Sequence, residues 1–164
     1  MNQYVQIYPT IALRPHLLQY TINEFPFIIL TIASLWVSMF CEFRWHEYFI
    51  YVALVFMIYL FSCFLQIIRT EYVITSEQII VLHGVISHST DYVELYRVVD
   101  YKQHRSLWQQ ILGLKTVTIY SGDRNNSILN MIGIKESIDI VAEIRKRVEY
   151  NKKRKSIYEI TNRM

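Results

Sequence analysis

The sequence has few residues that break helices or cross-link a chain: four glycines, three prolines and two cysteines among 164 residues. Two cysteines cannot form a disulfide framework. Neither Cys41 nor Cys63 has neighbours at the spacing of a metal site, so we interpret both as small apolar residues. The first 24 residues lack the basic start and compact apolar core of a secretory signal peptide, and we expect none. Charged residues make up only 19% of the chain and hydrophobic residues 52%, a balance that excludes disorder.

Charge is absent altogether from two long stretches, residues 25–41 and 48–68, which contain 17 and 21 residues. As helices they would measure roughly 25 and 31 Å, close to the thickness of a bilayer's hydrocarbon core. A chain of this size lacks the surface to cover two helices that are apolar on every side. The sequence therefore predicts a two-helix transmembrane hairpin over residues 25–68.

The six residues 42–47 between these stretches are charged and aromatic, and they suffice only for a tight turn at a membrane face. We expect Trp45 and Tyr48 to act as interfacial anchors there. From residue 69 onward the chain carries 15 basic and 11 acidic residues, against two and three before it. A basic part is attracted to an anionic cytoplasmic leaflet, which predicts a multi-pass protein of the inner (cell) membrane with both termini cytoplasmic.

After residue 69 the apolar pattern changes to short alternating runs, which predict strands near residues 72–75, 79–83, 85–93, 98–104, 115–120 and 128–134. An apolar stripe at helical spacing follows and predicts one amphipathic helix; its members are Ile134, Ile138, Val141, Ile144 and Val148. Short antiparallel strands followed by one helix are typical of a small barrel or bent sandwich that the helix closes at one end.

The order of these segments resembles that of the bacterial pleckstrin-homology-like (YdbS-like) membrane proteins. The resemblance covers about residues 25–150 and rests on structural signatures at Tyr72, Thr75, Gly84, Gln103, Ser106, Leu107, Leu112, Gly113, Leu114, Val117, Gly133 and Ile134. It implies an α+β protein, in which an N-terminal two-helix transmembrane hairpin precedes a PH-like bent, seven-stranded antiparallel β-barrel capped by a C-terminal α-helix. It implies no established enzyme activity.

The stretch of residues 101–120 brings His104, Arg105 and Ser106 together in sequence, which raises the question of catalysis. Neighbouring residues at a strand end point in opposite directions, and no acid is supplied locally, so we interpret the stretch as a corner of the fold. His83 and His88, with Asp91 nearby, could be metal ligands, but zinc needs three or four convergent ligands, usually with Cys or a helical His pair, so we interpret the two histidines as surface residues. We therefore expect no catalytic residue, metal or cofactor.

Basic residues concentrate near the end of the chain and are candidate contacts for anionic lipid: Arg145, Lys146, Arg147, Lys152, Lys153, Arg154 and Lys155. Few aromatic residues accompany them, which argues against nucleic acid. Inositol phosphates, which relatives of this fold often bind between the first two strands, are disfavoured because residues 75–78 there contain one acid and no base.

We divide the chain into an N-terminal interfacial segment (residues 1–24), the hairpin (25–68), the PH-like domain (69–150) and a basic tail (151–164). The first segment, broken by Pro9 and Pro15, lies along the interface or packs on the barrel. We interpret the whole as a non-catalytic binding or scaffolding module for the bilayer and an unidentified membrane protein. Self-association stays open, with Ala33 and Ser34 as one approach site. The alternatives are an accessory subunit of a transporter or envelope-defence system, or an enzyme that uses the barrel face near His104.

Overall fold

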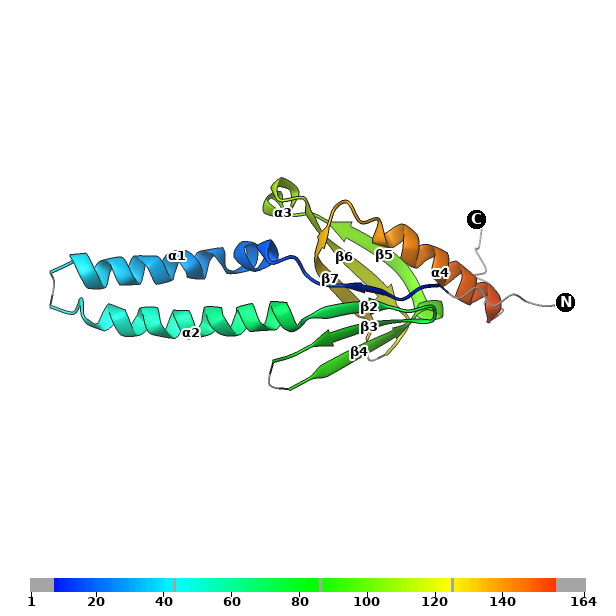
Figure 1. The fold of residues 1–164 in the computed structure, drawn as a ribbon, viewed down its shortest axis with the longest axis horizontal. Coiled ribbons are helices and arrows are strands. Elements are labelled where there is room, and N and C mark those ends of the chain that lie inside the picture. The colour runs from blue at the N-terminus through cyan, green and yellow to red at the C-terminus, as the bar shows by residue number, and fades with distance from the viewer. Residues whose placement is uncertain (1–7, 43, 86, 125, 156–164) are drawn as a thin grey trace.

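The computed structural model describes residues 8–42, 44–85, 87–124 and 126–155, and it consists of a long helical hairpin joined to a domain of strands and two shorter helices (Figure 1). The helices are α1 (Leu18–Phe40), α2 (Tyr48–Arg69), α3 (Leu107–Ile111) and α4 (Ile140–Arg154). The strands are β1 (Ile11–Leu13), β2 (Glu71–Ile74), β3 (Gln78–His83), β4 (Ser89–Glu94), β5 (Val98–His104), β6 (Leu114–Ser121) and β7 (Ile128–Lys135), with a 3₁₀ turn at Leu95–Arg97. The predicted α+β class is confirmed.

Helices α1 and α2 run side by side and project from one side of the domain (Figure 1). In their most apolar stretches only 11% and 6% of the residues are buried, so both helices expose apolar side chains along most of their length. By length and composition both suffice to cross a membrane. Beyond Gln19 near the domain, the buried positions of the hairpin are the small residues Thr31, Ser34 and Ala53, which let the two backbones approach closely.

Helix α1 begins at Leu18, seven residues before its predicted start, and continues through Pro26. The extra turns form because the domain supports them: the His16 backbone N–H donates to the Gly133 carbonyl at 2.9 Å, and Gln19 is buried. Helix α2 agrees with its prediction to within one residue. Of the predicted turn between them, Phe43 lies outside the described residues.

The strands form two antiparallel sheets, in the orders β1-β2-β3-β4 and β5-β6-β7. The six predicted strands correspond to β2–β7. The remaining strand, β1, comes from the N-terminal segment and pairs with β2, with Ile11 opposite Ile74. The N-terminal segment was expected either to lie along the interface or to pack on the barrel, and residues 11–13 pack on the barrel. The hairpin is thus inserted between β1 and β2. Residues 1–7 lie outside the described residues.

The core lies between the two sheets and α4. Strand alternation buries Val117, Ile119 and Met131, and α4 contributes Ile144 and Val148. The predicted helix start was wrong: Ile134 belongs to β7, and α4 begins only at residue 140, where the Asp139 side chain accepts from the Ala142 N–H at 3.3 Å. The helix then extends to Arg154, so residues 151–154 of the predicted tail are helical. No strand pairing joins the two sheets in the described residues, so the barrel is not closed.

Candidate functional site

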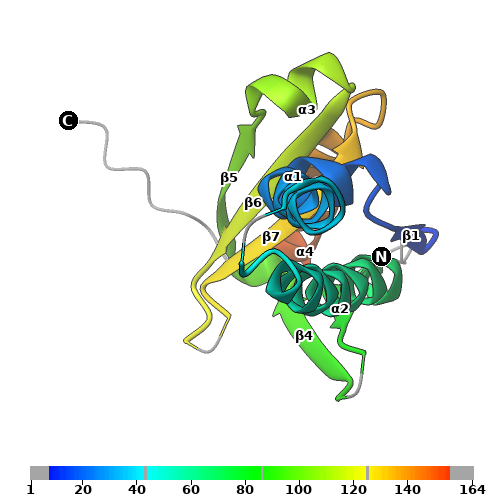
Figure 2. The same ribbon diagram turned by 90° about the vertical axis from the view of Figure 1, so that its left-hand side faces the viewer.

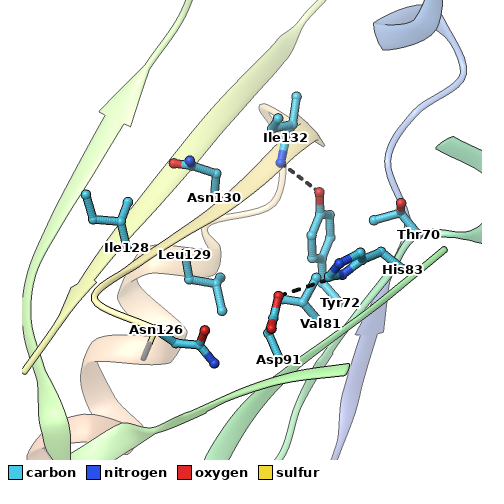
Figure 3. Close-up of a pocket in the computed structure, with 10 residues that line it drawn as sticks. All are labelled: Thr70, Tyr72, Val81, His83, Asp91, Asn126, Ile128, Leu129, Asn130 and Ile132. Carbon is cyan, nitrogen blue, oxygen red and sulfur yellow. Dashed lines mark hydrogen bonds and ion pairs between the residues drawn. The ribbon is translucent and has the colours of Figure 1, made fainter. Parts of the chain in front are cut away.

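Between the two sheets, beside the base of the hairpin, lies a cleft with a volume of about 290 Å³ (Figure 3). Its lining combines polar and apolar side chains from the α2 end, from β2–β4 and from β7 with its preceding loop: Thr70, Tyr72, Val81, His83, Asp91, Asn126, Ile128, Leu129, Asn130 and Ile132. Tyr72, Val81 and Asp91 lie in one row because the sheet register places each opposite the next. The same side of the sheet thus supplies a phenol, a carboxylate and an apolar floor.

Two hydrogen bonds join the sheets at the two ends of this cleft. The Tyr72 hydroxyl accepts from the Ile132 backbone N–H at 3.0 Å, and the Asn126 side-chain amide donates to the Tyr92 carbonyl at 3.3 Å. Between them the edge of β7 has no partner strand in the described sheets. Burial raises the pKa of Tyr72, and the hydrogen bond from Ile132 opposes that rise, so the phenol stays neutral at physiological pH.

His83 and Asp91 meet at the hairpin end of the cleft, with 3.8 Å between Nδ1 and Oδ2 (Figure 3). The side chains of both are more than two-fifths exposed. His88, the third residue considered as a metal ligand, is exposed on the β3–β4 connection. Within the described ranges, no group of three or more His, Cys, Asp or Glu side chains converges. The pair offers a ligand a hydrogen-bonding imidazole and carboxylate.

A family model described as the bacterial PH domain matches residues 17–148 of this chain. The chain belongs to the bacterial PH domain family. A solved structure with similarity to it is that of a DUF1696 family protein with a pleckstrin-homology domain from Shewanella loihica PV-4. The two chains share 17% identity, the match covers 52% of this chain and 72% of that one, and the TM-score is 0.37. No curated protein matches.

At the corner of residues 104–106 of the bacterial PH domain, Arg105 and Ser106 form structural contacts. The Ser106 hydroxyl caps α3 by accepting from the Gln109 backbone N–H at 3.3 Å, and the Gln109 side chain accepts in return from the Ser106 N–H at 3.1 Å. Arg105 forms an ion pair with Glu136. His104 is exposed at the end of β5. The capping box accounts for Ser106 and Gln109, and the ion pair accounts for Arg105.

Helix α4, which carries the candidate lipid contacts of the bacterial PH domain, ends at the side of the domain opposite the hairpin (Figure 1). Asn151 on α4 donates to the Ser76 carbonyl at 2.7 Å, and Arg154 pairs with Glu77 at 2.5 Å, so α4 ends beside the β2–β3 turn. The four residues of β2 separate that turn from the end of α2, a distance of roughly 13 Å. This exceeds the Debye length of about 8 Å at physiological salt, so the placement does not favour contact with the bilayer that the hairpin would enter.

Arg147 is excluded from the candidate lipid contacts because its side chain is fully buried. Its guanidinium donates to the carbonyls of Ile74, Thr75 and Pro9 at 3.1, 2.9 and 2.8 Å, and it pairs with Glu143 at 3.0 Å. The buried guanidinium on α4 is therefore hydrogen-bonded to the segment before β1 and to the end of β2. The remaining candidates line the outer side and end of α4, where Lys155 lies 3.7 Å from the Tyr96 ring centroid.

The predicted anchors Trp45 and Tyr48 lie at the tip of the hairpin, 58% and 57% exposed, with ring centroids 5.6 Å apart. The cleft residues were missed as a group by sequence reasoning, although His83 and Asp91 were noted. Some of them lie on neighbouring strands, β2 to β4, where the sheet register brings them together. Others lie on β7, whose outer edge has no partner strand in the described sheets. Alternation predicted which side chains face inward, and nothing local indicated where the barrel opens.

Proposed function

We propose that this protein is a membrane-anchored binding module, in which the α1–α2 hairpin spans the bilayer and holds the PH-like domain against the cytoplasmic leaflet. One observation carries the proposal: two helices of membrane-spanning length project from the domain, and almost none of their apolar side chains are buried. In water such a surface would drive aggregation, whereas in lipid it is satisfied.

The joint between hairpin and domain supports a fixed placement at the leaflet. Only Thr70 separates α2 from β2, so the chain has no linker there. On α1, the other helix of the hairpin, the buried Gln19 accepts a hydrogen bond from Gln109 at 2.8 Å. A domain held at two points cannot swing freely, so its cleft stays beside the membrane.

The cleft is the surface that we propose for binding, and an adjacent segment of a membrane protein is the partner it suits. Thr70 caps α2 and also lines the cleft, so a ligand there would lie next to the leaflet. The open β7 edge offers backbone hydrogen bonds to an extended peptide, and the His83–Asp91 pair offers polar contacts. Tethering raises the effective concentration for such a partner without high intrinsic affinity. Service as an accessory subunit of a transporter or an envelope-defence system is compatible with this role.

Membrane insertion and orientation are testable with the native cysteines. Cys41 ends α1 at the hairpin tip, so a Cys63→Ala variant carries a single thiol there. We expect a membrane-impermeant maleimide to label Cys41 when it is added to the outside of spheroplasts. The matched variant, Lys153→Cys in a chain with both native cysteines replaced by Ala, should react only in inverted vesicles. Recovery of the protein in the aqueous fraction after alkaline carbonate treatment, or labelling of both sites from one side, would refute the proposal.

Partner binding is tested by placing a photo-crosslinking residue in the cleft at the exposed Asn130 and, as a control, at the exposed Val99 of β5. We expect membrane-protein adducts from position 130 that diminish when Asp91→Ala is added. Equal adducts from both positions would show that the cleft does not select a partner.

A further inference from the structure

Helix α3 directs one of its two glutamines, Gln109, inward, while its apolar side chains and Gln110 face outward. Gln109 is only 4% exposed, whereas Leu107, Trp108 and Ile111 are 78%, 58% and 74% exposed. A solvent-facing helix has the opposite arrangement, because apolar side chains gain free energy when they leave water. The outward face of α3 is therefore an apolar surface that nothing in the described chain covers.

The orientation of α3 is fixed rather than incidental. The Gln109 side-chain amide donates to Gln19 at 2.8 Å and to Thr116 at 2.9 Å, and its carbonyl oxygen accepts from the Ser106 N–H. These buried bonds prevent the helix from turning to bury Trp108. The domain thus holds the apolar side chains outward, an arrangement that would be unfavourable in water.

The position of α3 identifies what covers it. In Figures 1 and 2, α3 lies on the side of the domain from which the hairpin emerges, next to the first turns of α1. Its Trp108 ring lies 6.0 Å from the ring of Phe25, which follows Glu24 and begins the uncharged stretch of α1. The apolar surfaces of α3 and of the hairpin are thus continuous, and they meet where the charged part of α1 ends.

A groove of about 220 Å³ runs between the two helices, lined by Thr21, Ile22, Phe25, Trp108, Ile111 and Leu112. This lining is almost wholly apolar. Its dimensions and chemistry suit the upper part of a lipid acyl chain, and a Trp at its rim suits the headgroup boundary, where indole rings are favoured.

We propose that α3 is embedded in the interfacial layer of the same bilayer that the hairpin spans, with Trp108 as its anchor and a lipid chain in the groove beside Phe25. This inference rests on the proposed membrane insertion and adds a third attachment point outside the hairpin. Three points that are not in line fix the rotation of the domain about the hairpin axis. The cleft of Tyr72 and Asp91 is thereby held at one angle to the leaflet.

Trp108 reports on its own surroundings once the other two tryptophans are replaced. The full-length variant with Trp36→Phe and Trp45→Phe is reconstituted into phospholipid vesicles that carry bromine either near the headgroups or near the chain ends. We expect blue-shifted Trp108 emission, strongly quenched by shallow bromine and weakly by deep bromine. Adding Leu107→Asn and Ile111→Asn, at two exposed positions, should shift the emission to the red and reduce the quenching. Val99→Asn, an exposed apolar position on β5, should change neither.

A second single-tryptophan protein, with Trp45→Phe and Trp108→Phe, keeps Trp36 in the second half of α1, within its uncharged stretch, and tests insertion separately. Quenching of Trp36 without quenching of Trp108 overturns the inference and leaves the hairpin in the membrane. Absence of quenching at both positions overturns the proposed insertion itself. A blue-shifted Trp108 that bromine does not quench also overturns the inference, because a protein surface such as a second copy of this chain would then cover α3.

Discussion

The side-chain amide of Gln109 donates a hydrogen bond to the side-chain oxygen of Gln19 across 2.8 Å, and both residues are buried. The pair joins α3 of the domain to the first turn of α1, so it connects elements that are 90 residues apart. Buried amides that satisfy one another are costly to separate, because each left alone keeps an unpaired polar group out of water. This contact makes the joint between hairpin and domain stiff.

Replacement of Gln109 by Ala should therefore destabilise the full chain by about 1–3 kcal/mol, since Gln19 loses its donor and α3 loses half of its capping box. Thermal or chemical unfolding in detergent micelles measures this change. Spin labels at Cys41 and at an introduced Lys153→Cys, in a Cys63→Ala chain, should also give a broader distance distribution. The neighbouring Gln110→Ala removes an exposed amide and serves as control. Equal effects of the two substitutions would contradict a stiff joint built on Gln109.

Gly133 tests the closeness of α1 to the domain. It has a φ of +71°, and a Cβ there would lie 2.9 Å from the Cβ of Gln19. Gly113 has a similar φ of +64° with no atom within 4 Å of the corresponding position. Both Gly→Ala changes incur backbone strain of about 1–2 kcal/mol, and only Gly133→Ala adds overpacking of about 1–3 kcal/mol. The difference between the two unfolding free energies isolates the contact with α1, and no difference would mean that α1 yields there at little cost.

Arg147 holds together the segments that the hairpin separates in sequence. Its Nη2 donates to the Pro9 carbonyl, and its Nη1 donates to carbonyls at the end of β2. We expect Arg147→Met to cost about 3–5 kcal/mol, because the carbonyls and Glu143 lose a buried charged partner. Limited proteolysis should then cut near β1 sooner than in wild type. Lys146→Met, one residue earlier and exposed, should change stability little. Similar losses of stability in both variants would show that Arg147 does not hold these segments together.

Much of the fold could be predicted because its signals are local. Alternation located β2–β7, and uncharged length located α2, since both patterns depend on residues close in sequence. The N-terminal strand could not be located in this way: β1 has three residues, and its pairing with β2 spans the whole hairpin. The start of α1 was missed for the same reason, because its first turns depend on contacts with β7 and α3.

The candidate sites show the same division. The charge run from Arg145 to Lys155 was visible in the sequence, but its location opposite the hairpin depends on the direction of α4 across the barrel. The burial of Arg147 depends on three carbonyls from other segments. The apolar turn from Leu107 to Leu112 was noted as a fold corner. That its apolar side faces outward follows only from Gln109 and its long-range partners.

The basic end of α4 should stay in water when the protein is in a membrane. A polarity-sensitive dye at Lys153→Cys, in a chain with both native cysteines replaced, should show the same emission in neutral and in anionic vesicles at physiological salt. The physical reason is the separation of more than one Debye length between this end and the hairpin. A dye at Leu107→Cys on α3 is the matched control and should report an apolar environment. A blue shift at position 153 that grows with anionic lipid would restore the lipid contact predicted from the charge run.

Tyr72 should make stability depend on alkaline pH. Burial raises the pKa of its phenol above the ordinary value of 10, the hydrogen bond from Ile132 partly offsetting this, so the folded state keeps the proton to higher pH than the unfolded state. The resulting stability is fully present below pH 10 and is lost as pH rises through the folded-state pKa, because the unfolded state then binds fewer protons. Tyr72→Phe should cost about 1–2 kcal/mol at neutral pH, since the Ile132 N–H loses its acceptor, and should flatten the decline in unfolding free energy above about pH 10. Tyr92→Phe removes an exposed hydroxyl from β4 as control, and an unchanged alkaline limb in Tyr72→Phe would show that this phenol ionises as easily in the folded protein as in the unfolded chain.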